Sequence, residues 1–402
     1  MNAVAQAAVS PAAAAAPAPL TAVAMSGGLD SSVAALLLER EGMPVVGLSM
    51  LLWDRSQQVR HGRCCGSLDL GDARRVAEQI GLPHYTLRMD GEFRRHVVDP
   101  FVDSYVDGRT PSPCISCNTE IKFEAFRERA RRLGADRIAT GHYARIRRGG
   151  DGRYELHTAA DRSKDQSYFL FELNQEQLAR AVFPLGELTK TEVREIAREA
   201  GLAVAEKGES MEICFVDRGV QEFVEGERPE IATRPARVTA SDGEELGEGA
   251  PYYRYTVGQR RGLGVAAGRR LYVLDVQPQE NRVVVGDRDE LLSPGLIGRG
   301  LHWIAGAPPH PAAEAAGGET VEVEVRIRSR HPGVEARVEG LPGTSGGTEE
   351  GVCRVDFAQP QAGVAPGQAA VFYRGTQVLG GCWIERTLSA RCQVQLARAA
   401  SR

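Results

Sequence analysis

The chain lacks a hydrophobic run of the length that crosses a bilayer, and it lacks a strong excess of either charge. A membrane-spanning helix needs about 20 consecutive apolar residues, so we expect no membrane association. The net charge is −4 over 402 residues. No global basic field therefore directs the chain to nucleic acid, and only a local basic patch could bind phosphates.

Charge is missing altogether before Asp30, a stretch that consists mostly of Ala, Pro and small polar residues. A mitochondrial leader needs arginines, and a secretory signal needs an unbroken apolar core, which Pro11, Pro17 and Pro19 interrupt. We therefore expect residues 1–20 to be a disordered tail and the protein to be cytoplasmic. In a reducing compartment the eight cysteines are expected to be functional thiols rather than a disulfide framework.

A glycine-rich segment near the N-terminus lacks the lysine of a loop that grips a triphosphate for γ-phosphoryl transfer. The segment reads Ser26-Gly27-Gly28-Leu29-Asp30-Ser31, between an apolar run predicted as a strand and residues 33–38, predicted as a helix. A helix N-terminus binds anions because its first N–H groups have no partners. Glycines let a phosphate approach the backbone closely. The pattern resembles the pyrophosphate loop of the ATP pyrophosphatase superfamily, although an ordinary glycine-rich strand–helix turn is the alternative.

The texture of the sequence changes near residue 217. Residues 21–216 alternate apolar strands (45–52, 84–89, 137–140) with helices (70–80, 121–133 and one from 189), which predicts a parallel α/β sheet. Thr189 and Glu192 have the spacing of a capping box at the start of the last of these helices. Short β-rich runs separated by Gly and Pro follow. We expect a catalytic domain over 21–216, a small β-rich middle domain over 217–291, a C-terminal β-barrel over 292–386 and a tail over 387–402.

Two cysteines stand in informative settings. Cys117 follows a loop that contains Pro111 and Pro113 and precedes the helix predicted over 121–133. A position at a helix N-terminus lowers the pKa of a thiol and favours the reactive thiolate. Cys214 stands alone where the α/β pattern ends. Cysteine is often buried for structural reasons, an alternative that the proline-rich loop disfavours for Cys117 and that stays open for Cys214.

Taken together, these segments closely resemble the bacterial tRNA-specific 2-thiouridylases. Three further segments match that family in order, over residues 139–144, 164–170 and 255–263, and the resemblance covers residues 21–386. It implies a PP-loop (adenine-nucleotide-hydrolase-like) domain followed by a middle domain and a tRNA-binding barrel. The implied reaction adenylates O2 of the wobble uridine with ATP and Mg²⁺ and then installs sulfur. The implied partners are the anticodon arm of tRNA and a persulfide donor, either a sulfur-relay protein or a cysteine desulfurase.

The resemblance assigns roles position by position. Cys117 matches the nucleophile and Cys214 the persulfide carrier, and the two would form a transient disulfide. The positions that match ATP-binding residues are Ala24, Met25, Ser26, Gly27, Gly28, Leu29, Asp30, Ser31, Met50 and Gly141. The positions that match residues near the tRNA or its target base are Ser112, Pro113, Cys114, His142, Lys164, Asp165, Gln166, Arg328, Ser329 and Gln368.

Cys114 leaves a second chemistry open. Together with Cys117 and Cys214 it makes three thiolates, enough to hold a [4Fe–4S] cluster with one iron open, whereas zinc would need further ligands. Cys64 and Cys65 receive no role.

Two other functions compete with the thiouridylase assignment. A ligating or amidating enzyme with the same loop, such as argininosuccinate or GMP synthetase, would need neither Cys117 nor Cys214. A non-catalytic tRNA-binding protein would keep the ATP loop only as structure, against which the intact loop and both cysteines argue.

Overall fold

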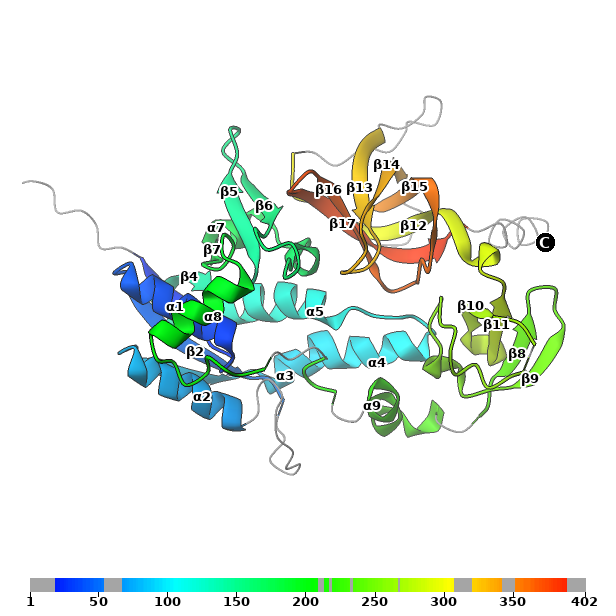
Figure 1. Cartoon of the computed structure of the whole chain (residues 1–402), viewed down its shortest axis with the longest axis horizontal. Coiled ribbons are helices and arrows are strands. Elements are labelled where there is room, and N and C mark those ends of the chain that lie inside the picture. The colour runs from blue at the N-terminus through cyan, green and yellow to red at the C-terminus, as the bar shows by residue number, and fades with distance from the viewer. Residues whose placement is uncertain are drawn as a thin grey trace, which may run out of the picture.

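The computed structural model describes residues 19–53, 67–208, 213–216, 219–231, 234–266, 268–306, 320–341 and 351–388. The two predicted tails lie almost entirely outside these ranges, as do Cys64 and Cys65. Within them the strands form three sheets, laid out along the chain from the blue to the red end in Figure 1. No helix of the described ranges is long and apolar enough to cross a membrane.

The first sheet has five parallel strands in the order β3-β2-β1-β4-β7. Their bounds are His84–Arg88, Val45–Leu51, Leu20–Ala24, Ala135–Ala139 and Ala181–Val182. Successive residues of a strand point to opposite faces, and Val23 accordingly packs with helices α1 (Leu29–Arg40), α2 (Ser67–Gln79) and α8 (Lys190–Glu199). Ala22 belongs to the cluster on the other face. The parallel α/β sheet predicted from the sequence is confirmed.

The predicted capping box at the start of α8 is confirmed as well. The Thr189 side chain accepts a hydrogen bond from Glu192 N, and the Glu192 carboxylate accepts one from Thr189 N. Two backbone donors at the helix start are thereby satisfied.

The opposite face of the sheet is covered by two long helical runs. One joins α3 (Asp90–Phe93), the π-helical segment η1 (Arg94–Val98) and α4 (Asp99–Val106). The other joins α5 (Pro113–Ser116), the π-helical segment η2 (Cys117–Ala125) and α6 (Phe126–Arg132). This second run begins at Pro113 rather than at residue 121 as predicted. Proline suits the first helical position because its missing N–H would have no intrahelical partner.

The middle sheet has four strands in the order β10-β11-β8-β9. Their bounds are Tyr272–Gln277, Arg282–Gly286, Arg237–Ala240 and Glu245–Glu248, and helix α9 (Val220–Glu227) precedes them. Val238, Val273 and Val283 lie in the core of this sheet and are fully buried. Short helical turns occupy connections between elements: η3 (Ser167–Leu170), η4 (Pro229–Ile231), η5 (Tyr252–Arg254), η6 (Pro278–Glu280) and η7 (Asp289–Leu291).

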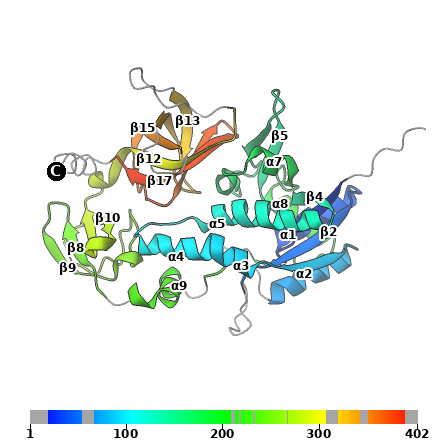
Figure 2. The same cartoon turned by 180° about the vertical axis from the view of Figure 1, so that it is seen from behind.

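The third sheet closes into a barrel, because its first strand also pairs with its last barrel strand. The barrel order is β12-β15-β14-β13-β16-β17, with bounds Leu292–Trp303, Val352–Ala362, Val334–Leu341, Thr320–Arg326, Ala369–Arg374 and Gln377–Thr387. Its interior is apolar. The predicted succession of α/β domain, β-rich middle domain and β-barrel is therefore confirmed, and Figure 2 shows it from behind.

A hairpin that the sequence did not predict joins the first part of the chain to the barrel. Strands β5 (Ala144–Arg148) and β6 (Tyr154–Thr158) are followed by η3 and helix α7 (Gln175–Arg180). In β6, His157 pairs with Gln377 of β17 and Leu156 pairs with Val378. The hairpin thus extends the barrel sheet, which fixes the barrel against the α/β domain (Figure 1).

Candidate active site

One cleft of about 360 Å³ gathers residues from distant parts of the α/β domain. It is lined by the glycine-rich loop, the start of the α5–η2 run, the end of β4 and residues 213–215. The predicted site residues that line it are Ala24, Met25, Ser26, Asp30, Ser31, Met50, Pro113, Cys114, Cys117, Gly141, His142, Gln166 and Cys214. The structure therefore brings the proposed ATP loop and the proposed catalytic cysteines to the same cavity.

The glycine-rich loop is shaped as an anion site. Helix α1 starts after Gly28, whose backbone is extended, and no side-chain cap bonds to the first turn. Ser26 N donates to Ser31 Oγ at 3.1 Å, which folds the loop back onto the helix start. An uncapped helix N-terminus in a polar loop is a ready site for a phosphate.

Two glycines of this region cannot be replaced without movement. Gly27 has a φ of +73°, and a Cβ there would lie 2.0 Å from the carbonyl oxygen of Asp69. At Gly141, a Cβ would lie 2.7 Å from backbone atoms of Asp30 and Ser31. Both distances are far below van der Waals contact, so the loop depends on these glycines for close backbone packing.

Two lysines that no motif pointed to hold the loop in place. Lys207 Nζ donates to Gly27 O at 2.8 Å and to the Asp69 and Asp72 carboxylates at 2.6 Å each. Burial acts to lower the pKa of Lys207, but these two carboxylates raise it above its usual value. These partners lie 135 to 180 residues away in the sequence, so no local pattern could have revealed them.

Asp30 is bonded by the second lysine. Lys190 Nζ contacts its two carboxylate oxygens at 2.8 and 2.9 Å, and Tyr143 Oη donates to it at 2.8 Å. The Asp30 carboxylate thus organises the start of α1 in this structure.

The environment of Cys117 corrects one expectation. The thiol is buried in the second turn of the helical run, not exposed at its N-terminus. Burial raises the pKa of Cys117 to about 11, although the nearby Lys122 acts in the opposite direction. The sequence predicted a lowered pKa, because it placed the helix start too late.

The other two cysteines of the cleft are more open. Cys114 is exposed and Cys214 is partly exposed. Among the described residues, no group of three His, Cys, Asp or Glu side chains is arranged to hold a metal ion. Cys114, Cys117 and Cys214 therefore do not form a ligand set for an iron–sulfur cluster in this arrangement, and we derive no step through one.

Sequence reasoning missed the polar residues that accompany Cys117. Lys122 Nζ donates to Asn118 Oδ1 at 2.9 Å, and Asn118 Nδ2 donates to Phe169 O at 2.9 Å. Of the described residues that line the cleft, Lys122 is the one lysine or arginine. Asn118 and Lys122 are four residues apart, the spacing at which two side chains meet on one helix, so the sequence could have identified them as a pair.

His142 is held neutral beside this group. Burial, and secondarily the charge of Lys122, lowers the pKa of His142 well below its usual value. Its Nδ1 lies 2.7 Å from Thr140 Oγ1, and its ring packs against Phe123 and Phe183. A neutral imidazole can donate one hydrogen bond to a nucleobase or accept one from it, but it has no positive charge with which to bind a phosphate.

Several residues predicted to contact tRNA lie outside this cleft. Arg328 and Ser329 are exposed in the turn after β13. Ser112 is the N-cap residue of α5, and Lys164 lies in a turn before η3. The remaining two side chains, Gln368 and Asp165, make contacts within the chain. Gln368 Nε2 donates to Thr110 O at 2.8 Å, and Asp165 forms a buried ion pair with Arg326.

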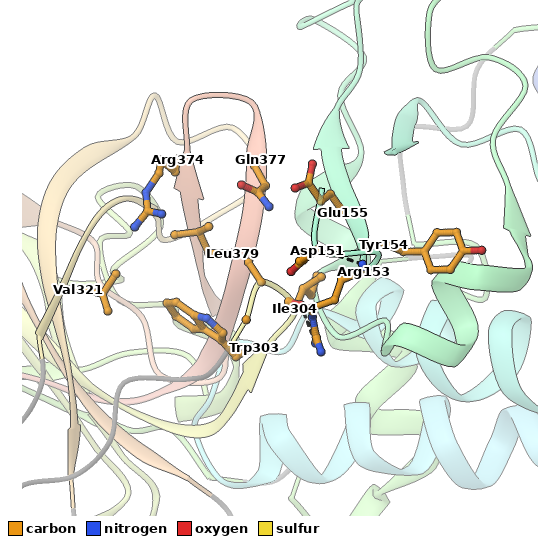
Figure 3. A pocket seen from close by; sticks show the side chains of 12 residues that line it. Asp151, Arg153, Tyr154, Glu155, Trp303, Ile304, Val321, Arg374, Gln377 and Leu379 are labelled. Atoms are coloured by element: carbon orange, nitrogen blue, oxygen red, sulfur yellow. Dashed lines mark hydrogen bonds between the residues drawn. The ribbon is translucent and has the colours of Figure 1, made fainter. Parts of the chain in front are cut away.

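A second cavity, of about 330 Å³, lies at the seam between the β5–β6 hairpin and the barrel. Figure 3 shows Asp151, Arg153 and Glu155 on the hairpin side, facing Trp303 and Gln377 of the barrel. Arg153 closes the seam by donating to Ile304 O at 3.2 Å. None of the predicted site residues lines this cavity.

A pyrophosphate-type loop on a parallel sheet, with cysteine side chains lining the same cleft, is the arrangement of a PP-loop enzyme. Family models match the chain in three consecutive parts: a "tRNA methyl transferase HUP domain" over residues 20–218, a "tRNA methyl transferase PRC-barrel domain" over 221–287 and an "Aminomethyltransferase beta-barrel domain" over 293–384.

Curated relatives are more specific. The tRNA-specific 2-thiouridylase MnmA of Geobacter metallireducens is 49% identical over 373 residues, covering 91% of this chain and 97% of the relative. That of Solibacter usitatus is 48% identical over 377 residues, covering 90% and 98%. The chain belongs to the tRNA-specific 2-thiouridylase family. A solved 4-thiouridine synthetase–RNA complex with bound ATP has a TM-score of 0.32 at 18% identity, over 53% of this chain and 51% of that one.

Proposed function

We propose that this protein uses ATP to replace the C2 oxygen of the wobble uridine of tRNA with sulfur. The observation that carries the proposal is the shared cleft, which places an uncapped helix N-terminus beside the thiols of Cys117 and Cys214. A ligase or amidating enzyme needs a nucleotide loop but no cysteines there. A non-catalytic tRNA-binding protein needs neither feature.

The first chemical step is adenylation of the uridine. An amide-like oxygen is a poor leaving group, so O2 attacks the α-phosphate of ATP and pyrophosphate departs. The N-terminus of α1, with Ser26 and Ser31, would bind the phosphates where charge develops. Mg²⁺ carried with ATP would neutralise the phosphates. Asp30 is the carboxylate of the described cleft lining that could contact it, after exchanging its bonds with Lys190.

The second step transfers sulfur. The terminal sulfur of a persulfide on Cys214 attacks C2, and AMP leaves with the former O2. Cys117 attacks the inner sulfur of Cys214, so the sulfur–sulfur bond of the persulfide breaks and a Cys117–Cys214 disulfide forms, which a reductant later opens. Lys122, which lines the same cleft as these cysteines, would stabilise the phosphate of the departing AMP.

The β-rich part of the chain would supply tRNA affinity. Arg260, Arg261 and Arg270 are exposed in the middle domain, and Arg328 is exposed on the barrel. Such side chains suit phosphate contacts that position the tRNA, and the target base must leave its stack to reach the cleft. We also propose a persulfide-donating partner, a cytoplasmic location that follows from the tRNA substrate, and domain boundaries at residues 216 and 291.

Nucleoside mass spectrometry tests the function directly. Cells that lack the gene should lack 2-thiouridine in tRNA, and the wild-type gene should restore it. Cys117→Ser and Cys214→Ser should not restore it, although both purified variants should still bind ATP. Cys353→Ala, a change at a buried barrel cysteine, is the matched control and should restore it. Unchanged 2-thiouridine in the deletion strain would refute the proposal.

A further inference from the structure

A buried ion pair joins the barrel to the loop that supports the ATP site. We infer that the Asp165–Arg326 pair is a positioning device, through which the C-terminal barrel holds Tyr143 and Asp30 at the start of α1 and so sets the affinity for ATP. This inference rests on the ATP-binding part of the proposed function. It gives the Asp165 side chain a role inside the protein in place of a contact with tRNA.

The pair is almost completely removed from solvent. Arg326, the last residue of β13, donates from Nη1 to Asp165 Oδ2 at 3.2 Å, and the two side chains are 10% and 6% exposed. The Arg326 guanidinium also lies 4.1 Å from the ring centre of Tyr373. The Asp165 carboxylate accepts three further hydrogen bonds, from Ala159 N, Ser167 N and Ser167 Oγ. It therefore fixes both ends of the loop that runs from β6 to η3.

Gln166, the residue after Asp165, connects this loop to the nucleotide loop through Tyr143. Gln166 and Tyr143 are bonded twice: Tyr143 N donates to Gln166 Oε1, and Gln166 N donates to Tyr143 O, each at 2.9 Å. Tyr143 is buried, and its hydroxyl donates to Asp30 at 2.8 Å. The barrel-bound carboxylate of Asp165 is therefore connected to the first turn of α1 through only two residues, Gln166 and Tyr143.

A second link from the same loop reaches the cation that neutralises Asp30. Asp161 Oδ2 accepts a hydrogen bond from Lys190 N at 3.0 Å. The Lys190 ammonium bonds Asp30 and lies 5.7 Å from the centre of the Tyr143 ring. A shift of the loop would thus disturb both groups that hold Asp30.

Loss of Arg326 and loss of both partners should have different consequences. Arg326→Met leaves a buried carboxylate without its cation, which is strongly unfavourable. Asp165 would then turn towards water and pull Gln166 from Tyr143. If Asp165→Asn is added, no buried charge remains, and the asparagine can still accept from Ala159 and Ser167. The second substitution is therefore expected to rescue the first.

Calorimetric titration of the full-length protein with ATP and Mg²⁺, without tRNA, tests this. Arg326→Met should weaken ATP binding about tenfold, a typical coupling between sites. The double variant should bind within about threefold of wild type. The matched control is Arg337→Met, which removes an exposed barrel arginine paired with Glu322 and should leave the affinity unchanged.

The outcomes separate the two claims. If the wild-type protein does not bind ATP, the proposed function fails at its first step. If the wild-type protein does bind ATP, two results would overturn the inference. One is that Arg326→Met binds ATP as well as wild type, and the other is that the double variant binds ATP no better than Arg326→Met. Should Arg326→Met not fold, as judged by circular dichroism, Asp165→Asn alone decides. It should weaken ATP binding about threefold, and wild-type affinity would refute the inference.

Discussion

The raised pKa of Cys117 predicts how slowly this thiol reacts in the protein without substrate. With a pKa of about 11, the thiolate fraction at pH 8 is about one in a thousand, whereas an ordinary thiol with a pKa of 9.0 would have about one in ten. Alkylation of Cys117 at pH 8 should therefore be about 100-fold slower than alkylation of a thiol with the ordinary pKa. Because the raised pKa keeps the Cys117 thiol protonated, its alkylation rate should rise about tenfold per pH unit and level off only near pH 11.

Iodoacetamide labelling followed by tryptic digestion measures this rate. Cleavage after Arg109 and Lys122 yields the peptide 110–122, which contains both Cys114 and Cys117. Fragment ions separate the two cysteines, and Cys114→Ser serves as the control that leaves one thiol in the peptide. Restricted access slows labelling at every pH but does not move the midpoint of the profile. A rate for Cys117 that levels off at or below pH 9 would refute the reasoning.

Lys122 provides a second arm of the same test. Its charge opposes the effect of burial on Cys117, so Lys122→Met should raise the pKa further and slow labelling at each pH, whereas Lys122→Arg should not. If Lys122→Met leaves the profile unchanged, the ammonium does not act on this thiol.

The other predictions concern the loop and the tRNA surface. Gly141→Ala forces a Cβ against backbone atoms of α1 and should destabilise the protein by about 1–3 kcal/mol and weaken ATP binding in calorimetry; Gly150→Ala, which meets nothing within 4 Å, should do neither. Lys207→Met removes the cation bonded to two carboxylates and Gly27 and should lower the unfolding free energy by about 2 kcal/mol in denaturant titration, so an unchanged midpoint would contradict it. Arg260→Glu should weaken tRNA binding in a gel-shift titration and flatten its salt dependence, and a wild-type salt slope would count against a phosphate contact there.

Local sequence patterns predicted the helices and strands. The side-chain contacts that they did not predict join residues far apart in the sequence. The strand–glycine–helix segment and the capping box at Thr189 are encoded within a few neighbouring residues, so the sequence predicted them correctly. The pairing of Asp30 with Lys190 and of Asp165 with Arg326 joins residues 160 and 161 positions apart, which no periodicity encodes. The position of Cys117 was misjudged for a local reason, because Pro113 starts the helix earlier than the apolar pattern does.

The strand β6 also has a consequence for folding during synthesis. Its residue His157 pairs with Gln377, which the ribosome adds 220 residues later (377 − 157). At about 5–20 residues per second, the partner strand arrives roughly 10–45 seconds after the hairpin has been made. During that interval the nascent chain carries an open strand edge, the kind of surface that pairs with other chains. The α/β domain can therefore reach its final form only after nearly the whole chain has been translated, and stretches of slow translation between β6 and β17 would lengthen the exposure.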